Sequence, residues 1–350
     1  MTTERQVSRK AARSPIVAAA AVTVDLSSND YLGLRNDPRV RAAAIRAIER
    51  YGVGSGGARD VAVGMGLVHE LEQRLALYKG VPIVRVTQSG YAANIGIIPV
   101  LVPHADMAAL AEAVHFAADG KHRVLIVTDG VFGMSGDIAP LPRIVEIAEA
   151  AGAEVMVDDA HGSGVLGHGR GTVAHFGLVE RISVQVGTAS KAMGVLGGYV
   201  TMFSEEIAAR FADSRPMTHS TALPPHLASA CLAALDVIEA EPERNDLLWA
   251  NRHRLADGLA SAGIDIGPSQ TPIVPVILRD PALALELGRR IRARGVIAGI
   301  LVPPKVAPHE ARLRLIASAA HSPAEIDFAV SVIADASRSI DGTADRSARV

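Results

Sequence analysis

The hydrophobic positions along the chain follow two periodicities in turn. Short continuous apolar runs recur, and between them apolar residues return every three or four positions, as they do on one face of a helix. Because the short runs are apolar throughout, they are expected to form strands that are buried on both faces. The pattern therefore predicts an α/β fold with a mostly parallel sheet. The predicted strands are residues 81–86, 123–128, 154–158, 182–186 and 198–203.

Two helices are predicted before the first of these strands. Asp37 and Pro38 open one of them, because proline fits the first turn of a helix, and Gly52 ends it. A second amphipathic helix occupies residues 68–80. The glycine-rich stretch GVGSGGARDVAVGMG lies between them and contains the spacing GxGxxG. A dinucleotide-binding loop of that spacing follows a strand, and this one follows a helix, so we reject that interpretation.

The sequence changes in character near residue 240. From there on, long helices alternate with isolated strands, which is typical of a smaller α+β domain. The expected helices cover residues 242–262 and 281–294 and begin again at Ser322, and the expected strands lie within residues 271–278 and 312–318. We therefore expect an N-terminal segment (1–37), a large domain (38–240), a small domain (241–338) and a flexible, polar tail (339–350).

Composition and charge exclude several classes of protein. The 350 residues are 49% hydrophobic and have a formal net charge of −2, so there is no general basic field to attract nucleic acid. Cys231 is the one cysteine, so no internal disulfide can form. No apolar run is long enough to span a membrane. Basic residues within 5–13 precede an apolar run at 16–24, which loosely imitates a secretory signal without a clear cleavage site, so a cytoplasmic location is expected.

Two short motifs contain the candidate chemistry. Asp158, the last residue of a predicted strand, begins the motif Asp158-Asp159-Ala160-His161. Lys191 comes 33 positions after Asp158 (191 − 158), in a turn of small residues. Ligands of open α/β sheets bind at the carboxyl ends of the strands. These residues could hold pyridoxal 5′-phosphate (PLP): the lysine would form a Schiff base with the aldehyde, and an aspartate would keep the pyridine nitrogen protonated.

Each motif also has a simpler explanation. Two aspartates after a strand are common in a capping turn, and together with His161 they could bind a metal ion. A lysine is most often solvated. However, no other charged residue lies between Arg181 and Glu205, and an apolar setting lowers the pKa of a lysine, which favours a nucleophilic amine. The two motifs together therefore favour a PLP site, and no metal is predicted.

Further residues could contact a phosphate or a substrate. The run Ser89-Gly90-Tyr91 follows a predicted strand and opens a helix, where main-chain N–H groups bind phosphate well, although an ordinary strand-to-helix turn explains it too. Thr188, in the turn of the candidate lysine, could place its hydroxyl on the phosphate. Arg312 and Arg314 share one face of a predicted strand, and one of them could bind a carboxylate with two hydrogen bonds.

Eight landmarks in the sequence, in the right order, resemble the α-oxoamine synthase family. They are SSNDYLGL, GSGGAR with a later HELE, QSGYAANIG, TDGVFGMSGDIAPL, VDDAHGSGVLG with a following GRG, GTASKAMGVLGGY, HSTALPP and ARLRLIASAAH. The likeness extends from about Leu26 to Ala334. It implies the aspartate-aminotransferase-like (type I) fold of PLP-dependent transferases, and a homodimer. The implied reaction joins an amino acid to an acyl-CoA thioester, releases CoA and forms an α-amino ketone.

The resemblance also implies roles for individual residues. Lys191 matches the Schiff-base lysine, Asp158 the partner of the pyridine nitrogen, and His161 the donor to the ring's phenolic oxygen. Asn29 and Arg314 match positions that contact the substrate amino acid. The residues that would hold the phosphate are Ser89, Gly90, Tyr91 and Thr188, with Ser220 and Thr221 reaching across from a second subunit.

The chain departs from the family pattern in two places. Gly133 stands where members have a serine near the cofactor ring. After Pro103 a few dozen residues are missing, including a histidine that stacks on the pyridine ring, and His104 matches a different position. Loss of a strand there would expose backbone groups and apolar surface. Three alternatives follow: a working synthase, a catalytically impaired homologue that keeps the fold, and an aminotransferase of the same fold.

The motifs indicate the amino acid substrate better than the acyl group. The motifs GGYV, SRP and TPIVPVI resemble the glycine C-acetyltransferases of the family, which favours glycine with a short acyl-CoA. GVGSGGAR resembles the 8-amino-7-oxononanoate synthases of the biotin pathway equally well. The expected amino acid is therefore glycine, or alanine, and the acyl group is left open.

Overall fold

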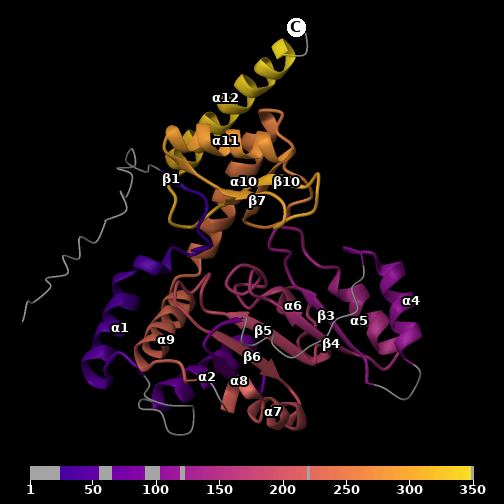
Figure 1. Ribbon diagram of the computed structural model, residues 1–350. Coiled ribbons are helices and arrows are strands. Elements are labelled where there is room, and N and C mark those ends of the chain that lie inside the picture. The colour runs from indigo at the N-terminus through magenta and orange to yellow at the C-terminus, as the bar shows by residue number, and fades with distance from the viewer. Residues whose placement is uncertain (1–23, 55–64, 91–102, 119–122, 219–220, 348–350) are drawn as a thin grey trace, which may run out of the picture.

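The computed structural model describes residues 24–54, 65–90, 103–118, 123–218 and 221–347, in two stacked parts (Figure 1). The larger part surrounds a five-stranded sheet in which β6 runs antiparallel to both of its neighbours and the other pairs are parallel. Four of the five strands therefore point the same way, which confirms the mostly parallel sheet. In spatial order the strands are β2 (Ile83–Thr87), β6 (Gly198–Met202), β5 (Val184–Thr188), β4 (Glu154–Asp158) and β3 (Leu125–Asp129).

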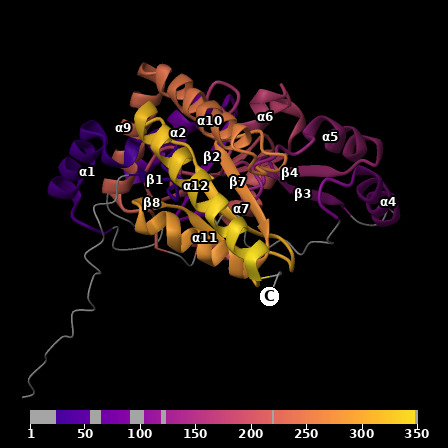
Figure 2. The same ribbon diagram turned by 90° about the horizontal axis from the view of Figure 1, so that it is seen from above.

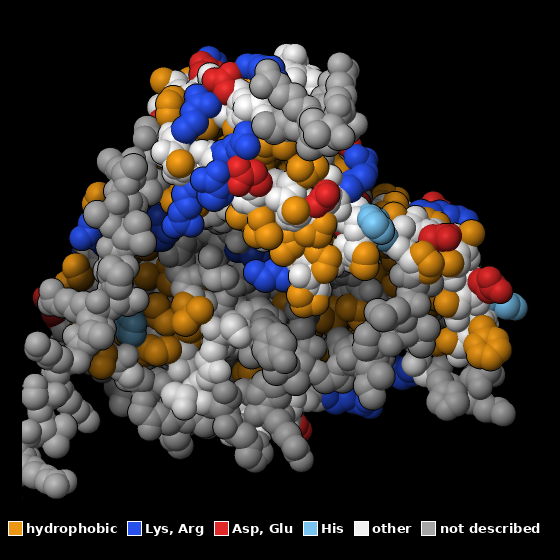
Figure 3. Space-filling view, turned by 45° about the horizontal axis from the view of Figure 1, so that its top comes forward, with side chains coloured by type: hydrophobic (Ala, Val, Ile, Leu, Met, Phe, Trp, Pro, Cys, Tyr) orange, Lys and Arg blue, Asp and Glu red, His pale blue; other side chains and the backbone are white. Residues whose placement is uncertain are grey.

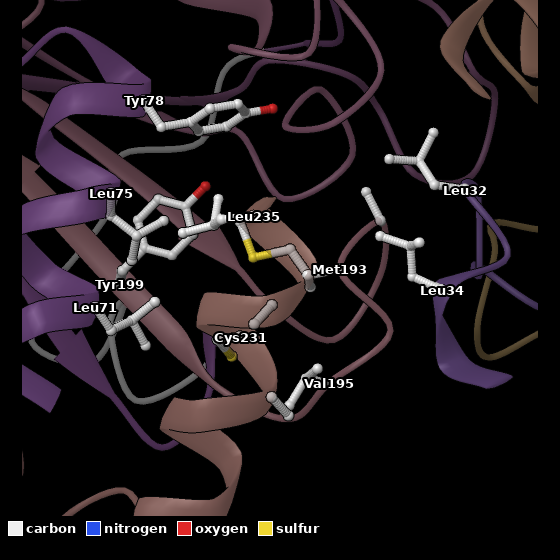
Figure 4. Packing of buried hydrophobic residues seen from close by; sticks show 14 of the residues in the cluster. Leu32, Leu34, Leu71, Leu75, Tyr78, Met193, Val195, Tyr199, Cys231 and Leu235 are labelled. Atoms are coloured by element: carbon white, nitrogen blue, oxygen red, sulfur yellow. The ribbon is translucent and has the colours of Figure 1, made fainter. Parts of the chain in front are cut away.

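Helices cover the sheet because each buries one apolar stripe. Helix α9 packs on both α1 and α2, and α2 also packs on β2. Figure 4 shows the core that results, where Leu71 and Leu75 of α2 face Cys231 and Leu235 of α9, next to Tyr199 of β6. The helices of this part are α1 (Pro38–Tyr51), α2 (Met65–Lys79), α4 (Met107–Ala117), α5 (Leu141–Ala150), α6 (Thr172–His175), α7 (Glu205–Ala212), α8 (Arg215–Thr218) and α9 (Pro225–Ala240), with short 3-10 turns at Leu34–Asn36 and Val179–Arg181.

The C-terminal part has a core of its own. Its antiparallel sheet has the order β7-β10-β9, and β1 pairs with β8 beside it. Helix α12 lies against α10 and α11 (Figure 2). The domain division near residue 240 stays a prediction. The elements are β1 (Val24–Asp25), α10 (Glu243–Ser261), β7 (Ile273–Arg279), α11 (Pro281–Ala293), β8 (Val296–Ile297), β9 (Gly299–Leu301), β10 (Ala311–Ile316) and α12 (Pro323–Ser347).

The C-terminal part includes residues from both terminal regions of the described chain. Val24 and Leu26, from the expected N-terminal segment (1–37), belong to its hydrophobic core. Helix α12 continues to Ser347, past residue 339, where a flexible tail was expected to begin. Ile340 is buried in the same core, and this apolar contact explains why the helix does not end there.

The surface carries mixed charge. Figure 3 shows Lys and Arg side chains gathered over the C-terminal part, with Asp and Glu side chains among them. Arg279 pairs with Asp265 at 3.0 Å, and Arg294 pairs with Asp335 at 3.1 Å. Such exposed pairs contribute little to stability. Within the described part of the chain, no helix is long and apolar enough to cross a membrane.

Strand β3 forms one edge of the large sheet as far as the structure describes it. Among the described residues, β3 pairs only with β4. Leu125 and Val127, alternate residues of β3, are 38% and 41% exposed, although strand residues of this type are usually covered. An edge strand with exposed apolar side chains is the feature that the loss of a neighbouring strand would leave.

A buried ion pair joins the end of α2 to the segment after β4. Nζ of Lys79 lies 3.1 Å from Oδ2 of Asp159 and 3.2 Å from Oγ of Ser163, and it also donates to the carbonyl oxygen of Arg170. The side chains of Lys79 and Asp159 are 1% and 0% exposed. Asp159 also accepts a hydrogen bond from the main-chain N–H of Thr172 at 3.0 Å. These contacts fix the loop between β4 and α6.

We predict that Lys79→Met destabilises the protein by about 3–5 kcal/mol, because the carboxylate of Asp159 would stay buried without its positive partner. Urea unfolding followed by circular dichroism measures the change. Lys305→Met is the matched control, since Lys305 is exposed, and it should unfold like the parent protein. An unchanged unfolding midpoint for Lys79→Met would show that the pair is not needed for the fold.

Candidate active site

The candidate residues meet where β3, β4 and β5 end. Asp129 and Asp158 are the last residues of adjacent parallel strands and lie opposite each other in the register. Thr188 ends β5, and Lys191 follows in a tight turn in which the N–H of Gly194 donates to the carbonyl oxygen of Lys191 at 3.0 Å. This is the carboxyl edge of the sheet, where ligands of α/β folds bind.

Lys191 is held in a setting that favours its neutral form. Burial lowers the pKa of its ammonium group to about 8, and the positive charge of Arg314 acts in the same direction. The carboxylates of Asp158 and Asp129 oppose this shift but do not cancel it. Near neutral pH a larger share of the amine is therefore neutral than in an ordinary lysine, and the neutral form is the one that attacks an aldehyde.

Asp129 is a site residue that the sequence analysis did not identify. Desolvation raises the pKa of its carboxyl group to about 6, and the neighbouring charge of Asp158 adds to the rise, although the residue as a whole is exposed. Lys191 and His104 act in the opposite direction. Its place directly after the predicted strand 123–128 was the available signal, similar to the strand-end position that drew attention to Asp158.

The structure brings Asn29 and Arg314 together. On β10, the Nε–H of Arg314 donates to the carbonyl oxygen of Gly133 at 2.6 Å, and Nη2 donates to Oδ1 of Asn29 at 3.1 Å. Among the described contacts, these bonds use two of the five N–H donors of the guanidinium. Arg314 therefore keeps donors with which it could bind a carboxylate. Arg312, the other arginine considered as a carboxylate ligand, forms an ion pair with Glu310, in which Nη2 lies 3.4 Å from Oε2.

His161 lies between Tyr31 and Gly133. The Tyr31 hydroxyl is 2.7 Å from Nδ1 of His161, and the two rings meet edge to face with their centroids 6.2 Å apart. On the other side, a Cβ atom on Gly133 would lie 2.6 Å from Nε2, so a serine would collide with the ring. Burial lowers the pKa of His161 to about 2, and the charges of Lys191 and Arg314 lower it further, so the imidazole is neutral.

The candidate phosphate site is described only in part. Tyr91 and Ser220 lie outside the described residues, and Thr221 is exposed. Ser89 and Gly90 pass directly over the start of β6, since a Cβ atom on Gly198 would lie 2.3 Å from the carbonyl carbon of Ser89. This close approach requires a glycine on β6.

Thr188 adjoins the same corner of the sheet. A Cβ atom on Gly90 would lie 3.6 Å from that of Thr188. The Thr188 hydroxyl donates to the carbonyl oxygen of Gly197 at 2.8 Å, and it lies 2.8 Å from the hydroxyl of Ser190. These bonds of Thr188 stabilise the turn that contains Lys191. Thr188 is buried, whereas its partner Ser190, which was not among the predicted site residues, is exposed.

Asp159, one of the three residues of the alternative metal site, has a different partner. Asp159 is directed into the buried pair with Lys79, away from Asp158, as expected for successive residues at a strand end. Among the residues that the structure describes, no group of three or more His, Cys, Asp or Glu side chains could hold a metal ion.

The donor set does fit PLP. Lys191 is a lysine whose pKa is lowered to about 8, and Asp158 is a carboxylate close enough to affect that pKa. His161 is a neutral imidazole in the same group of side chains, as the effect of Lys191 on its pKa shows. Ser89 and Gly90 bring main-chain groups to the corner beside β5, where an anionic substituent could bind.

Comparison with known proteins gives one consistent answer. The family model for aminotransferases of class I and II matches residues 96–333. An 8-amino-7-oxononanoate synthase from Symbiobacterium thermophilum is 45% identical to this chain, and the match covers 91% of the chain and 89% of that protein. 8-amino-7-oxononanoate synthase 1 from Bacillus subtilis is 41% identical, with 89% and 87% covered.

Solved structures agree with the sequence relatives. A serine palmitoyltransferase from S. paucimobilis superposes with a TM-score of 0.84 at 28% identity, over 91% of this chain and 88% of that one. An 8-amino-7-oxononanoate synthase from Francisella tularensis has a TM-score of 0.72 at 22% identity, over 90% and 98%, which shows the same fold. Together with the motifs, these relatives confirm the type I fold and the resemblance. The chain belongs to the class I and II aminotransferase family and, within it, to the α-oxoamine synthases, which are PLP-dependent acyltransferases.

Proposed function

We propose that this α-oxoamine synthase joins alanine to a seven-carbon dicarboxylic acyl-CoA and forms 8-amino-7-oxononanoate. Condensation of an amino acid with an acyl-CoA is the general reaction of its family. The observation that carries the proposal is the grouping of Lys191, Asp158, His161 and Arg314 at one edge of the sheet, in a chain 45% identical to an 8-amino-7-oxononanoate synthase.

The substrates follow from the carbon skeleton of that product. Its nine carbons carry a ketone next to the carbon that bears the amine. Cleavage of the bond between these two carbons leaves a seven-carbon dicarboxylic acyl group and a two-carbon fragment, CH3–CH(NH2). Alanine supplies this fragment if its carboxyl group leaves as CO2, while formation of the new C–C bond breaks the thioester and releases CoA. The balance is alanine plus acyl-CoA to amino ketone, CO2 and CoA.

This proposal differs from the preference for glycine and a short acyl group that the motifs suggested. The relatives named above carry the name of the alternative, 8-amino-7-oxononanoate synthase. The extra methyl group of alanine is what the product requires. We therefore propose the second of the two family activities that the sequence left open.

The residues of the site have separate tasks in this proposal. When bound, PLP supplies an electron sink that stabilises negative charge on the amino acid's Cα. Lys191 would hold the cofactor and, once the amino acid has displaced it, would take a proton at Nζ. Asp158 would keep the pyridine nitrogen protonated. Asn29 and Arg314 would orient the amino acid through its carboxylate.

Other features are proposed from the family alone. Ser89, Gly90, Tyr91 and Thr188 would surround the phosphate. A homodimer would let Ser220 and Thr221 reach the site of the partner subunit. A cytoplasmic location, and the absence of nucleic acid and membrane partners, remain predictions from composition and charge.

A second candidate function is a catalytically impaired homologue. We propose an internal deletion after Pro103, and the exposed Leu125 and Val127 on the edge of β3 support it. Gly133 removes one hydroxyl from the site. Against impairment stands the retained charge balance around Lys191, which a chain without catalytic function has no need to keep.

We predict that the rate of PLP attachment to the cofactor-free protein rises with pH, reaches half of its maximum near pH 8 and levels off about one pH unit higher. Only the neutral amine of Lys191 attacks the aldehyde, and burial lowers the pKa of this amine to about 8 from the ordinary 10.5. Stopped-flow absorbance in the visible band of lysine-bound PLP measures the rate. Lys305→Ala should keep this profile, and Lys191→Ala should not attach PLP. A midpoint near 10.5 would contradict the buried setting of Lys191.

We further predict that kcat/KM for alanine with a seven-carbon dicarboxylic acyl-CoA exceeds that for glycine with acetyl-CoA by at least about tenfold, because a pocket built for a methyl group loses affinity without it. Release of CoA, followed with a thiol reagent, measures both reactions. Lys191→Ala is the blank. A preference for glycine and acetyl-CoA would reject the proposed substrates, and PLP binding without CoA release from either pair would favour the impaired homologue.

Restoring the family serine is predicted to weaken the site. A Cβ atom at position 133 would lie 2.6 Å from Nε2 of His161, so Gly133→Ser must displace the ring, at a cost of about 1–3 kcal/mol. We expect a higher Kd for PLP, measured by absorbance titration. Gly66→Ser is the control, because a Cβ atom there meets nothing within 4 Å. Tighter binding by Gly133→Ser would show that the missing hydroxyl, rather than the fit of His161, limits the site.

A further inference from the structure

We propose that Tyr31 is a positioning residue for His161: its hydroxyl donates to Nδ1 and thereby keeps the imidazole proton on Nε2, the nitrogen that faces Gly133. The proposal deepens the proposed function and rests on it in one respect, since the Nε2–H group would then donate to the phenolic oxygen of PLP. The tautomer itself is a property of the protein without cofactor.

The contact between the two side chains is short, and Tyr31 is buried while His161 is half-buried. The Tyr31 oxygen lies 2.7 Å from Nδ1, and Tyr31 is 1% exposed. Burial raises the pKa of the phenol and lowers that of the imidazole, so both groups are neutral. Each then has one proton to share, which leaves two arrangements: the phenol donates to Nδ1, or Nδ1–H donates to the phenol oxygen.

The first arrangement satisfies more groups. If Nδ1–H were the donor, the hydroxyl proton of Tyr31 would need a second acceptor, and among the described contacts His161 is its only partner. A buried hydroxyl without an acceptor is unfavourable. If the phenol donates instead, the lone pair of Nδ1 and the phenol proton satisfy each other.

The other nitrogen is then free to act as a donor toward the site. Nε2 lies on the side of Gly133, where a Cβ atom would come within 2.6 Å, so the missing side chain leaves room in front of this nitrogen. Lys191 and Arg314 bring positive charge to the same region and disfavour an imidazolium. The surroundings thus favour a neutral ring with its proton on Nε2.

The main chain at Tyr31 is hydrogen-bonded to residues of the C-terminal part. The N–H of Ala319, in the segment after β10, donates to the carbonyl oxygen of Tyr31 at 2.7 Å. The Ser318 hydroxyl donates to the carbonyl oxygen of Asp30 at 2.5 Å. His161 belongs to the loop after β4, in the large domain. The hydroxyl of Tyr31 therefore connects the C-terminal part to the imidazole of His161.

The experiment is 15N NMR of the cofactor-free protein labelled in histidine, with the His161 signals assigned by their loss in His161→Gln. We expect Nε2 to carry the proton, and Nδ1 to show the shift of an acceptor in a hydrogen bond. Tyr31→Phe should move the Nδ1 signal to that of a nitrogen without a donor. It should also raise the Kd for PLP about tenfold, because loss of one hydrogen bond that orients His161 changes a binding constant by about this factor.

Tyr78→Phe is the matched control. Tyr78 is also a buried tyrosine, but its hydroxyl donates to the carbonyl oxygen of Gly169 at 2.6 Å, so His161 should not respond to the change. If Tyr31→Phe does not fold, 3-fluorotyrosine incorporation tests the same bond, because the more acidic phenol donates more strongly and should move the Nδ1 signal without altering the packing.

A proton on Nδ1 in the parent protein overturns the proposal, and so does a His161 spectrum that responds neither to Tyr31→Phe nor to fluorination. Both results are independent of the proposed function. If the NMR spectra agree with the proposal but PLP does not bind, Tyr31 still positions His161, and the proposed function is what fails.

Discussion

The buried pair of Lys79 and Asp159 is the interaction on which the site depends. Successive residues at a strand end point to opposite sides, so Asp159 enters the core while Asp158 stays at the carboxyl edge of the sheet. A carboxylate with no exposure is stable only with a partner, and Lys79 brings one from the end of α2. The loop after β4, which also holds His161, is thereby fixed by a contact that takes no part in the chemistry.

The pKa of Lys191 is set by opposing effects of burial and of several charged residues. Burial and Arg314 lower the pKa of its ammonium, while Asp158 and Asp129 limit the shift to a value near 8. Arg314 comes from β10, Asp129 from β3 and Asp158 from β4, so the balance exists only when both parts of the molecule are in place. The C-terminal sheet thus contributes, through Arg314, to a pKa that burial lowers most.

The sequence was sufficient for features that depend on local patterns. Continuous apolar runs predicted all five strands of the large sheet to within two residues at each end, because burial on both faces leaves a direct mark on composition. Asp158 was proposed as a site residue because strand ends bind ligands, and Lys191 because its turn of small residues has no other charge nearby. The pairing of Tyr31 with His161 was not found, since 130 residues separate them. The role of Asp159 was also missed: its neighbours suggest a capping turn, while its partner Lys79 is remote in sequence.

Asp129 links the open edge of the sheet to the chemistry. It ends β3, the strand with one described neighbour, and its residue is exposed although desolvation already raises its pKa to about 6. A further strand beside β3 would shield this carboxyl more, raise its pKa and leave less negative charge near Lys191. The pKa of Lys191 would then fall, since Asp129 is one of the two groups that hold it up. An open edge at β3 therefore makes the lysine more basic than a covered edge would, without any change in the residues that touch the cofactor.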